Sequence, residues 1–180
     1  MPGPVFLAGD DVTLRTVERD DLDFLQRNRN HPTVRRWMPR VHPENREQLE
    51  SAFEGYLSDT DGVNLLACVD GDAVGFCSLF DVNHDSGRAE LAAWVTPDAQ
   101  GAGYGTEAAE LLVDYAFAER RLHRLVAGAL ATNGPSRAVL ETLGFVEEGR
   151  QRDQYFVDGE YVDRVLYGLL EPEWVEKRTQ

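Results

Sequence analysis

The stretch Gln100-Gly101-Ala102-Gly103-Tyr104-Gly105-Thr106 stands between two segments of different periodicity. An apolar run over residues 91–95 precedes it and predicts a strand. The apolar residues that follow it at helical spacing predict a helix: Ala108, Leu111, Leu112, Tyr115 and Ala116. A glycine-rich turn between strand and helix lets a ligand approach the backbone, while the first-turn amides and the helix dipole favour an anion. The stretch therefore predicts a pyrophosphate site.

Two common phosphate-binding patterns do not describe this turn. A nucleotide P-loop requires Gly-Lys-Ser/Thr after the glycines, whereas Gly105 is followed by Thr106 and Glu107. A dinucleotide-binding turn follows the first strand of a βαβ series. Here the turn lies past the middle of the chain, behind several predicted antiparallel strands. Both alternatives are disfavoured.

The pattern resembles the coenzyme A loop, Gln/Arg-x-x-Gly-x-Gly/Ala, of the GNAT N-acetyltransferase family. In that family the amides of the loop hold the pyrophosphate of the coenzyme. The resemblance assigns acetyl-CoA as the co-substrate and gives the binding role to the following residues: Gln100, Gly101, Ala102, Gly103, Tyr104, Gly105 and Thr106.

A second motif lies downstream in the matching order. Asn133-Gly134-Pro135-Ser136 precedes Leu143-Gly144-Phe145. Pro135 suits a first helical turn and Gly144 suits a helix C-cap, so a short helix leads into a strand that begins at Phe145. The order is similar to the second coenzyme-contacting segment of the family, which implies that Asn133 and Ser136 line the cofactor site.

Further features resemble the branch that acetylates the N-terminal alanine of ribosomal proteins. They are Leu14-Arg15 with Asp20-Asp21-Leu22, Arg88-Ala89-Glu90-Leu91, and the closing strand around Tyr161 and Asp163. The resemblance spans about residues 10–170. The branch also contains enzymes that act on polyamines, amino acids and antibiotics. The acceptor is therefore expected to be a primary amine, either a protein N-terminus or a small amine.

Length and composition predict one N-acetyltransferase domain over residues 1–180, with its core at about 10–170. No apolar run reaches membrane-spanning length, and the N-terminus lacks a secretory pattern, so we expect a cytoplasmic protein that binds no membrane. The oligomeric state is open, with a homodimer as one expectation.

The formal net charge of −14 admits two interpretations. An acidic surface attracts cationic acceptors such as polyamines or basic peptides and repels nucleic acid, so no direct nucleic-acid partner is expected. The alternative is that the negative charge serves only to keep the protein surface solvated. Lys177 is the single lysine beside seventeen arginines, a bias that suits a salt-rich cytoplasm or a GC-rich genome.

The predicted fold class is α/β (α+β): a central mixed, mostly antiparallel sheet with helices on both faces, as the resemblance implies, splayed at the acetyl-CoA site. Residues 12–15 predict an opening strand, and residues 125–130 predict another. Pro43 predicts the start of a longer helix. Asp70-Gly71 and Asp158-Gly159 predict tight hairpins.

Cys68 and Cys77 lie on the two strands of the first hairpin. Pairing Val69 with Asp72 leaves Cys77 about four rungs from Cys68, on the order of 13 Å, whereas a disulfide spans roughly 7 Å at most. Both cysteines are therefore expected to be free, inert core thiols.

Glu90 is the predicted general base. A primary amine must lose a proton when it attacks a thioester, and its pKa is about 8 for an α-amine. Glu90 shares one strand face with Ala92 and Trp94, so its carboxylate can take that proton directly or through water. The alternative is a structural glutamate bonded to Arg88 or to a neighbouring strand. The resemblance also assigns the backbone near Trp94 and Val95 to the pantetheine and thioester.

Protonation of the departing thiolate has no obvious donor. Many family members carry a tyrosine seven residues after the motif asparagine, but here that position is Leu140. Ser136 stands where some of this branch are thought to place an acid, with Asn133 holding a water or the pantetheine. The open alternatives are a helix-terminus role for Ser136, catalysis without an acid, and a coenzyme A sensor without catalysis.

Acceptor recognition is expected from the early helices and the last hairpin. The candidate residues are Trp37, Tyr155, Tyr161 and Asp163. Asp163 could hold a cationic amine and the aromatic rings could wall a slot, although Trp and Tyr at such spacings also serve as core. The four histidines have no metal-ligand spacing, so no metal is expected.

Overall fold

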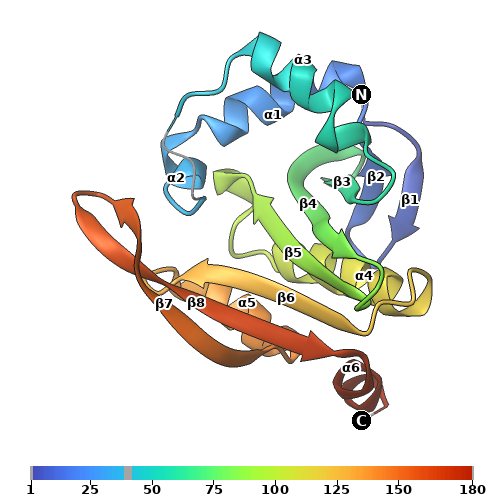
Figure 1. Cartoon of the computed structure of the whole chain (residues 1–180). Coiled ribbons are helices and arrows are strands. Elements are labelled where there is room, and N and C mark those ends of the chain that lie inside the picture. The colour runs from blue at the N-terminus through green and yellow to red at the C-terminus, as the bar shows by residue number, and fades with distance from the viewer. Residues whose placement is uncertain (1, 39–41, 180) are drawn as a thin grey trace.

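A single eight-stranded sheet runs through the molecule in the order β1-β2-β3-β4-β5-β6-β8-β7 (Figure 1). The computed structural model describes residues 2–38 and 42–179. The strands are β1 (Val5–Ala8), β2 (Thr13–Thr16), β3 (Val63–Val69), β4 (Asp72–Asn83), β5 (Arg88–Val95), β6 (Arg124–Leu130), β7 (Val146–Val157) and β8 (Glu160–Leu170). All neighbours are antiparallel except β5 and β6, which run parallel.

The helices pack on both faces of this sheet. They are α1 (Leu22–Arg29), α2 (Pro32–Arg35), α3 (Arg46–Glu54), α4 (Tyr104–Ala118), α5 (Gly134–Leu143) and α6 (Glu171–Arg178). In Figure 1, α1 and α3 lie over the half of the sheet formed by β2–β5, while the β7–β8 hairpin extends beyond the rest of the molecule. The mixed, mostly antiparallel sheet with helices on both faces confirms the predicted α/β (α+β) fold class.

Each face of the sheet has its own hydrophobic core. The larger core joins the sheet to α4, α5 and α6 and includes Leu112, Leu125 and Trp174. The smaller core joins β3 and β4 to α1 and α3 and includes Leu25 and Leu49. In Figure 1, no helix of the described residues lies over the α1/α3 face of β6 and β8, beside the smaller core.

The two parallel strands separate after three residues. Arg88, Ala89 and Glu90 of β5 pair with residues 124–126 of β6. β5 continues to Val95 and β6 to Leu130, yet no further pairs join them. The predicted splay is therefore present, and it starts directly after Glu90.

Both predicted hairpins form with the backbone that their turns require. Asp70 and Gly71 have φ of 52° and 90°, and Asp158 and Gly159 have φ of 51° and 92°. Two successive residues at positive φ characterise a type I′ turn, which matches the twist of the flanking strands. The turn dipeptides thus set the register at which both hairpins begin.

The two cysteines are free and buried, as predicted, but the geometry differs from the expected one. A bulge between Ala67 and Cys68 places Cys77 opposite Leu65, three residues from Cys68 instead of four. Cys77 belongs to the α4-side core and Cys68 to the α1-side core, so the thiols lie on opposite faces of the sheet. Burial raises the pKa of Cys68 to about 11 and that of Cys77 to about 12.

Several element boundaries differ from the predicted ones. The opening strand of residues 12–15 is β2, and β1 precedes it on the sheet edge. Helix α3 begins at Arg46, not at Pro43, because the side chains and amides of Asn45 and Gln48 cap it reciprocally at 2.8 and 2.9 Å. Within the described residues, no helix is both long enough and apolar enough to span a bilayer.

Candidate active site

The glycine turn adopts the open backbone that its sequence suggested. Gly101 and Gly103 have φ of 81° and 90°, a region that side chains disfavour. Gly103 is the N-cap of α4. A Cβ built on either glycine would meet no atom within 4 Å, so the surface above the turn is free for a ligand.

The turn presents unused hydrogen-bond donors. The amides of Thr106 and Glu107 donate to the Gly103 carbonyl at 3.0 and 3.1 Å, whereas those of residues 101–105 donate to no other described residue. These amides lie at the positive end of the 15-residue helix α4. The Glu107 carboxylate accepts from the amides of Asp11 and Val12 at 2.9 and 3.1 Å, so part of its charge is stabilised there. The helix start can therefore hold an anion.

The alternation of an antiparallel pair decides which residues of β5 turn their backbone groups to its unpaired edge. The Thr96 amide donates to the Val74 carbonyl at 2.8 Å, and the pairing with β4 is regular from Val95 back to Glu90. Alternate residues turn their backbone groups to opposite neighbours. Ala93 and Val95 therefore face the splay, while Trp94 faces β4, which revises the expected role of the Trp94 backbone.

The Trp94 side chain has a packing role. Its ring stacks between those of Phe24 and Phe76, at centroid distances of 5.9 and 6.1 Å. Trp94 thereby anchors the end of β5 to the smaller core. This fixes the free edge of the strand beside the splay.

Glu90 lies on the last rung that joins β5 to β6. Its Oε1 accepts a hydrogen bond from Nη2 of Arg164 in an ion pair, with 17% of the Glu90 side chain exposed. Arg88 pairs instead with Asp81 at 2.9 Å. Sequence reasoning missed Arg164, although Gly128 in the predicted strand 125–130 was a signal, because an interior strand glycine often marks a close approach.

Asn133 and Ser136 lie where the chain leaves β6 and enters α5. The Asn133 Oδ1 accepts from the Ser136 amide at 3.2 Å, which caps the helix. Ser136 is half-buried, and Leu140 belongs to the larger core. Position 140 therefore supplies packing, and Asn133 is fixed at the side of the splay opposite β5.

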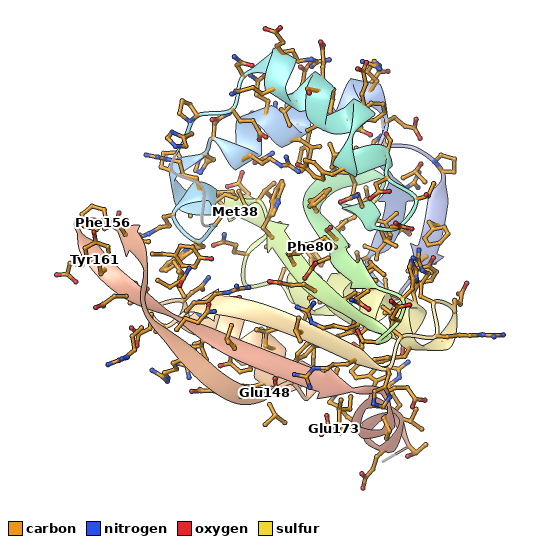
Figure 2. The ribbon with its side chains drawn as sticks, viewed as in Figure 1. Met38, Phe80, Glu148, Phe156, Tyr161 and Glu173 are labelled. Atoms are coloured by element: carbon orange, nitrogen blue, oxygen red, sulfur yellow. The ribbon has the colours of Figure 1, made fainter. Side chains whose placement is uncertain are left out.

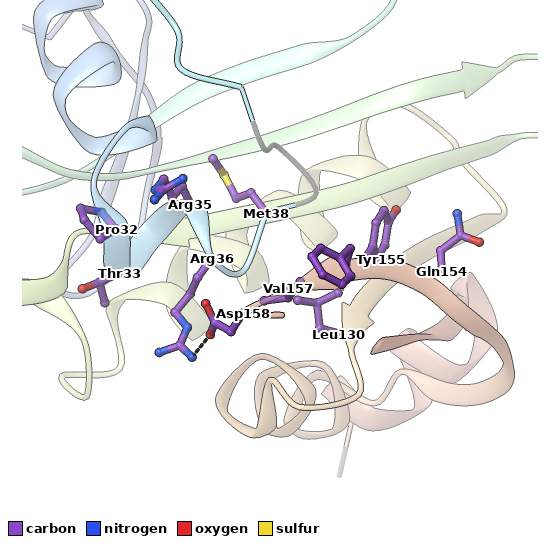
Figure 3. A pocket seen from close by; sticks show the side chains of 11 residues that line it. Pro32, Thr33, Arg35, Arg36, Met38, Leu130, Gln154, Tyr155, Val157 and Asp158 are labelled. Atoms are coloured by element: carbon purple, nitrogen blue, oxygen red, sulfur yellow. Dashed lines mark hydrogen bonds and ion pairs between the residues drawn. The ribbon is translucent and has the colours of Figure 1, made fainter. Parts of the chain in front are cut away.

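A pocket of about 580 Å³ opens between α2 and the tip of the β7–β8 hairpin (Figure 3). Arg36 and Asp158 form an ion pair of 2.5 Å across one side of it. Its lining is Pro32, Thr33, Arg35, Arg36, Met38, Leu130, Gln154, Tyr155, Phe156, Val157 and Asp158. Leu130 ends β6, so the pocket adjoins the splayed end of the sheet.

Of the predicted acceptor residues, only Tyr155 lines this pocket. The Arg36 guanidinium lies 4.7 Å from the Trp37 ring centroid. Tyr161 is 68% exposed at the hairpin, where its ring meets Phe156 edge-on at 5.1 Å (Figure 2). Asp163 accepts from the Asp153 amide at 3.0 Å. The described residues contain no cluster of three metal-ligating side chains.

Residues 11–146 match the acetyltransferase (GNAT) domain family. The chain belongs to this family. It is a GNAT-family N-acetyltransferase, and the match includes the glycine turn, Glu90, Asn133 and Ser136.

Relatives of this acetyltransferase differ in their named acceptors. The "Putative ribosomal N-acetyltransferase YdaF" of Bacillus subtilis is 32% identical over 170 residues, covering 91% of this chain and 93% of that protein. The spermidine N(1)-acetyltransferase of Escherichia coli K12 is 27% identical over 164 residues, covering 91% and 88%. The crystal structure of the Vibrio cholerae spermidine N-acetyltransferase with CoA and spermine superposes with a TM-score of 0.88 at 24% identity, over 93% of this chain and 99% of that one.

Proposed function

We propose that this acetyltransferase moves the acetyl group of acetyl-CoA to the α-amine of a protein N-terminus. The observation that supports acetyl-CoA as the donor is the free edge of β5 beside the unused amides at the start of α4. These groups fit coenzyme A, because donors at a helix N-terminus complement a pyrophosphate and an unpaired strand edge complements the amide-containing pantetheine arm. Bound acetyl-CoA supplies the activated acetyl thioester.

The proposed binding roles follow the geometry. The turn from Gln100 through Gly101, Ala102, Gly103, Tyr104, Gly105 and Thr106 holds the pyrophosphate. The backbone of Val95, with Ala93 in place of Trp94, holds the pantetheine and the thioester. Asn133 and Ser136 border the same opening from the β6 side.

Glu90 is the proposed base. The amine nitrogen forms a bond to the acetyl carbonyl carbon, the carbon–sulfur bond breaks, and the proton lost by nitrogen passes to the Glu90 carboxylate. A proton then joins the sulfur, for which the Ser136 hydroxyl or water is the proposed donor. Leu140 excludes a tyrosine from the remaining position.

The pocket between α2 and the hairpin is the proposed acceptor site. It carries two arginines and one aspartate, and Asp158 is already paired with Arg36. No described residue forms an ion pair or hydrogen bond with the Arg35 side chain. A lining with an unpaired guanidinium suits a peptide, whose carbonyl and carboxylate oxygens accept hydrogen bonds, better than it suits a polycation.

Polyamine acetylation is the second candidate. It is favoured by the spermidine N(1)-acetyltransferase relative and by the net charge of −14. The two candidates predict opposite changes in the KM of the acceptor when the positive charge of Arg35 is removed from the pocket lining. A cytoplasmic location, a single domain over 1–180 and a homodimer remain predictions of the sequence.

The test is thiol release from acetyl-CoA in dilute and in molar salt. Three acceptor classes are compared: peptides that begin with Ala, Ser or Thr; polyamines; and free amino acids. Saturable release with peptides alone supports the proposal, and release with polyamines alone replaces it by the second candidate. Measurable acetyl-CoA binding without release with any class would contradict both and favour a coenzyme A sensor.

A further inference from the structure

Arg164 and Glu90 form an ion pair although their strands are not neighbours. Glu90 lies on β5 and Arg164 on β8, with β6 between them. The pair is partly shielded, with 23% of the Arg164 side chain exposed. The guanidinium must therefore cross the full width of β6 to reach the carboxylate.

Gly128 of β6 makes this crossing possible. A Cβ built on Gly128 would lie 2.1 Å from Nε, 2.5 Å from Nη2 and 2.6 Å from Cζ of Arg164. The backbone of Gly128 is outside the left-handed region, so its conformation does not require glycine. The reason for glycine here is space, because any side chain would displace the guanidinium.

The crossing ends at the point where the sheet opens. Glu90 pairs with Val126, and the next residue of β5 has no partner on β6. Arg164 occupies Oε1 of Glu90, which leaves Oε2 without a hydrogen-bond partner among the described residues. A charge-assisted hydrogen bond of this kind fixes the orientation of a carboxylate.

We propose that Arg164 is a positioning residue, which reaches over Gly128 to hold Glu90 so that its second oxygen faces the acceptor amine. The inference rests on the proposed function of Glu90 as the base. Its chemical basis is that a base must lie within hydrogen-bond reach of the proton it removes, and small misplacements cost rate.

A second ion pair in the same sheet supplies a matched comparison. Arg124 of β6 pairs with Glu148 of β7, and β8 lies between them. A Cβ on Gly168 of β8 would lie 2.4 Å from a carboxylate oxygen of Glu148. This pair also crosses a strand at a glycine, but the strands stay joined on both sides of it: β8 pairs with β6 throughout, and with β7 before and after a bulge at Glu148.

The experiment compares Gly128→Ala with Gly168→Ala in steady-state kinetics, with CoA affinity by calorimetry and thermal unfolding. Gly128→Ala is expected to lower kcat roughly 10- to 100-fold with unchanged CoA affinity. Gly168→Ala is expected to leave kcat within about twofold. Arg164→Lys, which keeps the charge, is expected to retain more activity than Arg164→Met.

A double variant separates positioning from general destabilisation. In a Glu90→Gln background, Gly128→Ala is expected to cause no further loss of kcat, because the residue it positions is already gone. Additive losses, or equal losses in Gly128→Ala and Gly168→Ala, would overturn the inference while leaving the proposed function intact. A wild-type protein without turnover on any acceptor would overturn the proposed function, and the inference would fall with it.

Discussion

The two halves of β5 differ in what they contribute. In the first half, Ala89 packs against β6 and is fully buried, and its pairing partner Leu125 is also fully buried. In the second half, Ala92 and Ala93 are exposed and the backbone edge has no partner. One strand thus stabilises the sheet at its closed end and offers hydrogen-bonding groups to a ligand at its open end. The boundary between these tasks is Glu90.

The largest expected effect is at the open end. Gly103→Glu is expected to abolish measurable CoA binding, because it places bulk and negative charge over the free amides and strains a residue at φ of 90°. Gly159→Glu is the control, since Gly159 has φ of 92° and an equally open surface at the hairpin tip. Calorimetric titration of both variants decides; normal affinity in folded Gly103→Glu would remove the loop assignment.

The boundary residue is expected to give the next largest effect. Glu90→Gln should lower kcat by about 10²–10⁴ because a carboxamide cannot accept the amine proton, while CoA affinity stays unchanged. Glu148→Gln removes a carboxylate from the matching ion pair within the closed sheet and should leave kcat unchanged. Steady-state kinetics over a range of pH checks this, and full turnover of Glu90→Gln at every pH would exclude Glu90 as the base.

A core substitution at the closed end of the sheet should lower the free energy of unfolding. Leu125→Ala is expected to lower the free energy of unfolding by about 2–5 kcal/mol, because it leaves a cavity in the larger core. Val146→Ala, at a side chain that is 55% exposed, should change it by less than about 0.5 kcal/mol. Urea titration gives both values. If Leu125→Ala also weakened CoA binding in its folded fraction, the two ends would not be independent.

A smaller change is expected at the proposed acceptor pocket, which lies beyond the open end. Arg35→Gln should raise KM for a peptide acceptor roughly two- to fivefold and lower it for spermidine, because it removes an exposed positive charge from the lining. Arg27→Gln, an exposed arginine of α1 outside the pocket, is the control. A higher KM for spermidine in Arg35→Gln would contradict the proposed charge preference.

The thiols of the paired strands give the smallest expected effect. Cys68 and Cys77 should not react with a thiol reagent at pH 8 in the folded protein, and both should react in urea. Because burial raises their pKa to about 11 and 12, the unfolded chain ionises first, from its ordinary pKa of 9.0. The two buried neutral thiols therefore contribute fully to stability below about pH 9.0. This contribution falls as the pH rises from there toward 11–12. Rapid reaction in the folded state would indicate that this part of the sheet opens.

Local patterns in the chain were sufficient for much of the fold. The glycine turn, the two Asp-Gly hairpins and the Asn133 helix follow from short-range backbone rules, and each forms as predicted. β1 and α6 were not predicted. β1 depends on pairing at the sheet edge with β2, whereas α6 has local start signals that were missed: Pro172 in its first turn and Glu173, which accepts from the Leu170 amide. The reciprocal cap of Asn45 and Gln48 was missed in favour of Pro43.

The sequence by itself determined the proposed donor side of this protein, because a glycine turn and a helix N-terminus bring free backbone amides together from neighbouring residues. Only the tertiary structure decided the proposed acceptor side. The meeting of α2 with the β7–β8 hairpin, and the reach of Arg164 over Gly128 to Glu90, join residues more than thirty positions apart. Such contacts depend on strand order and on the space between side chains, which no local pattern specifies.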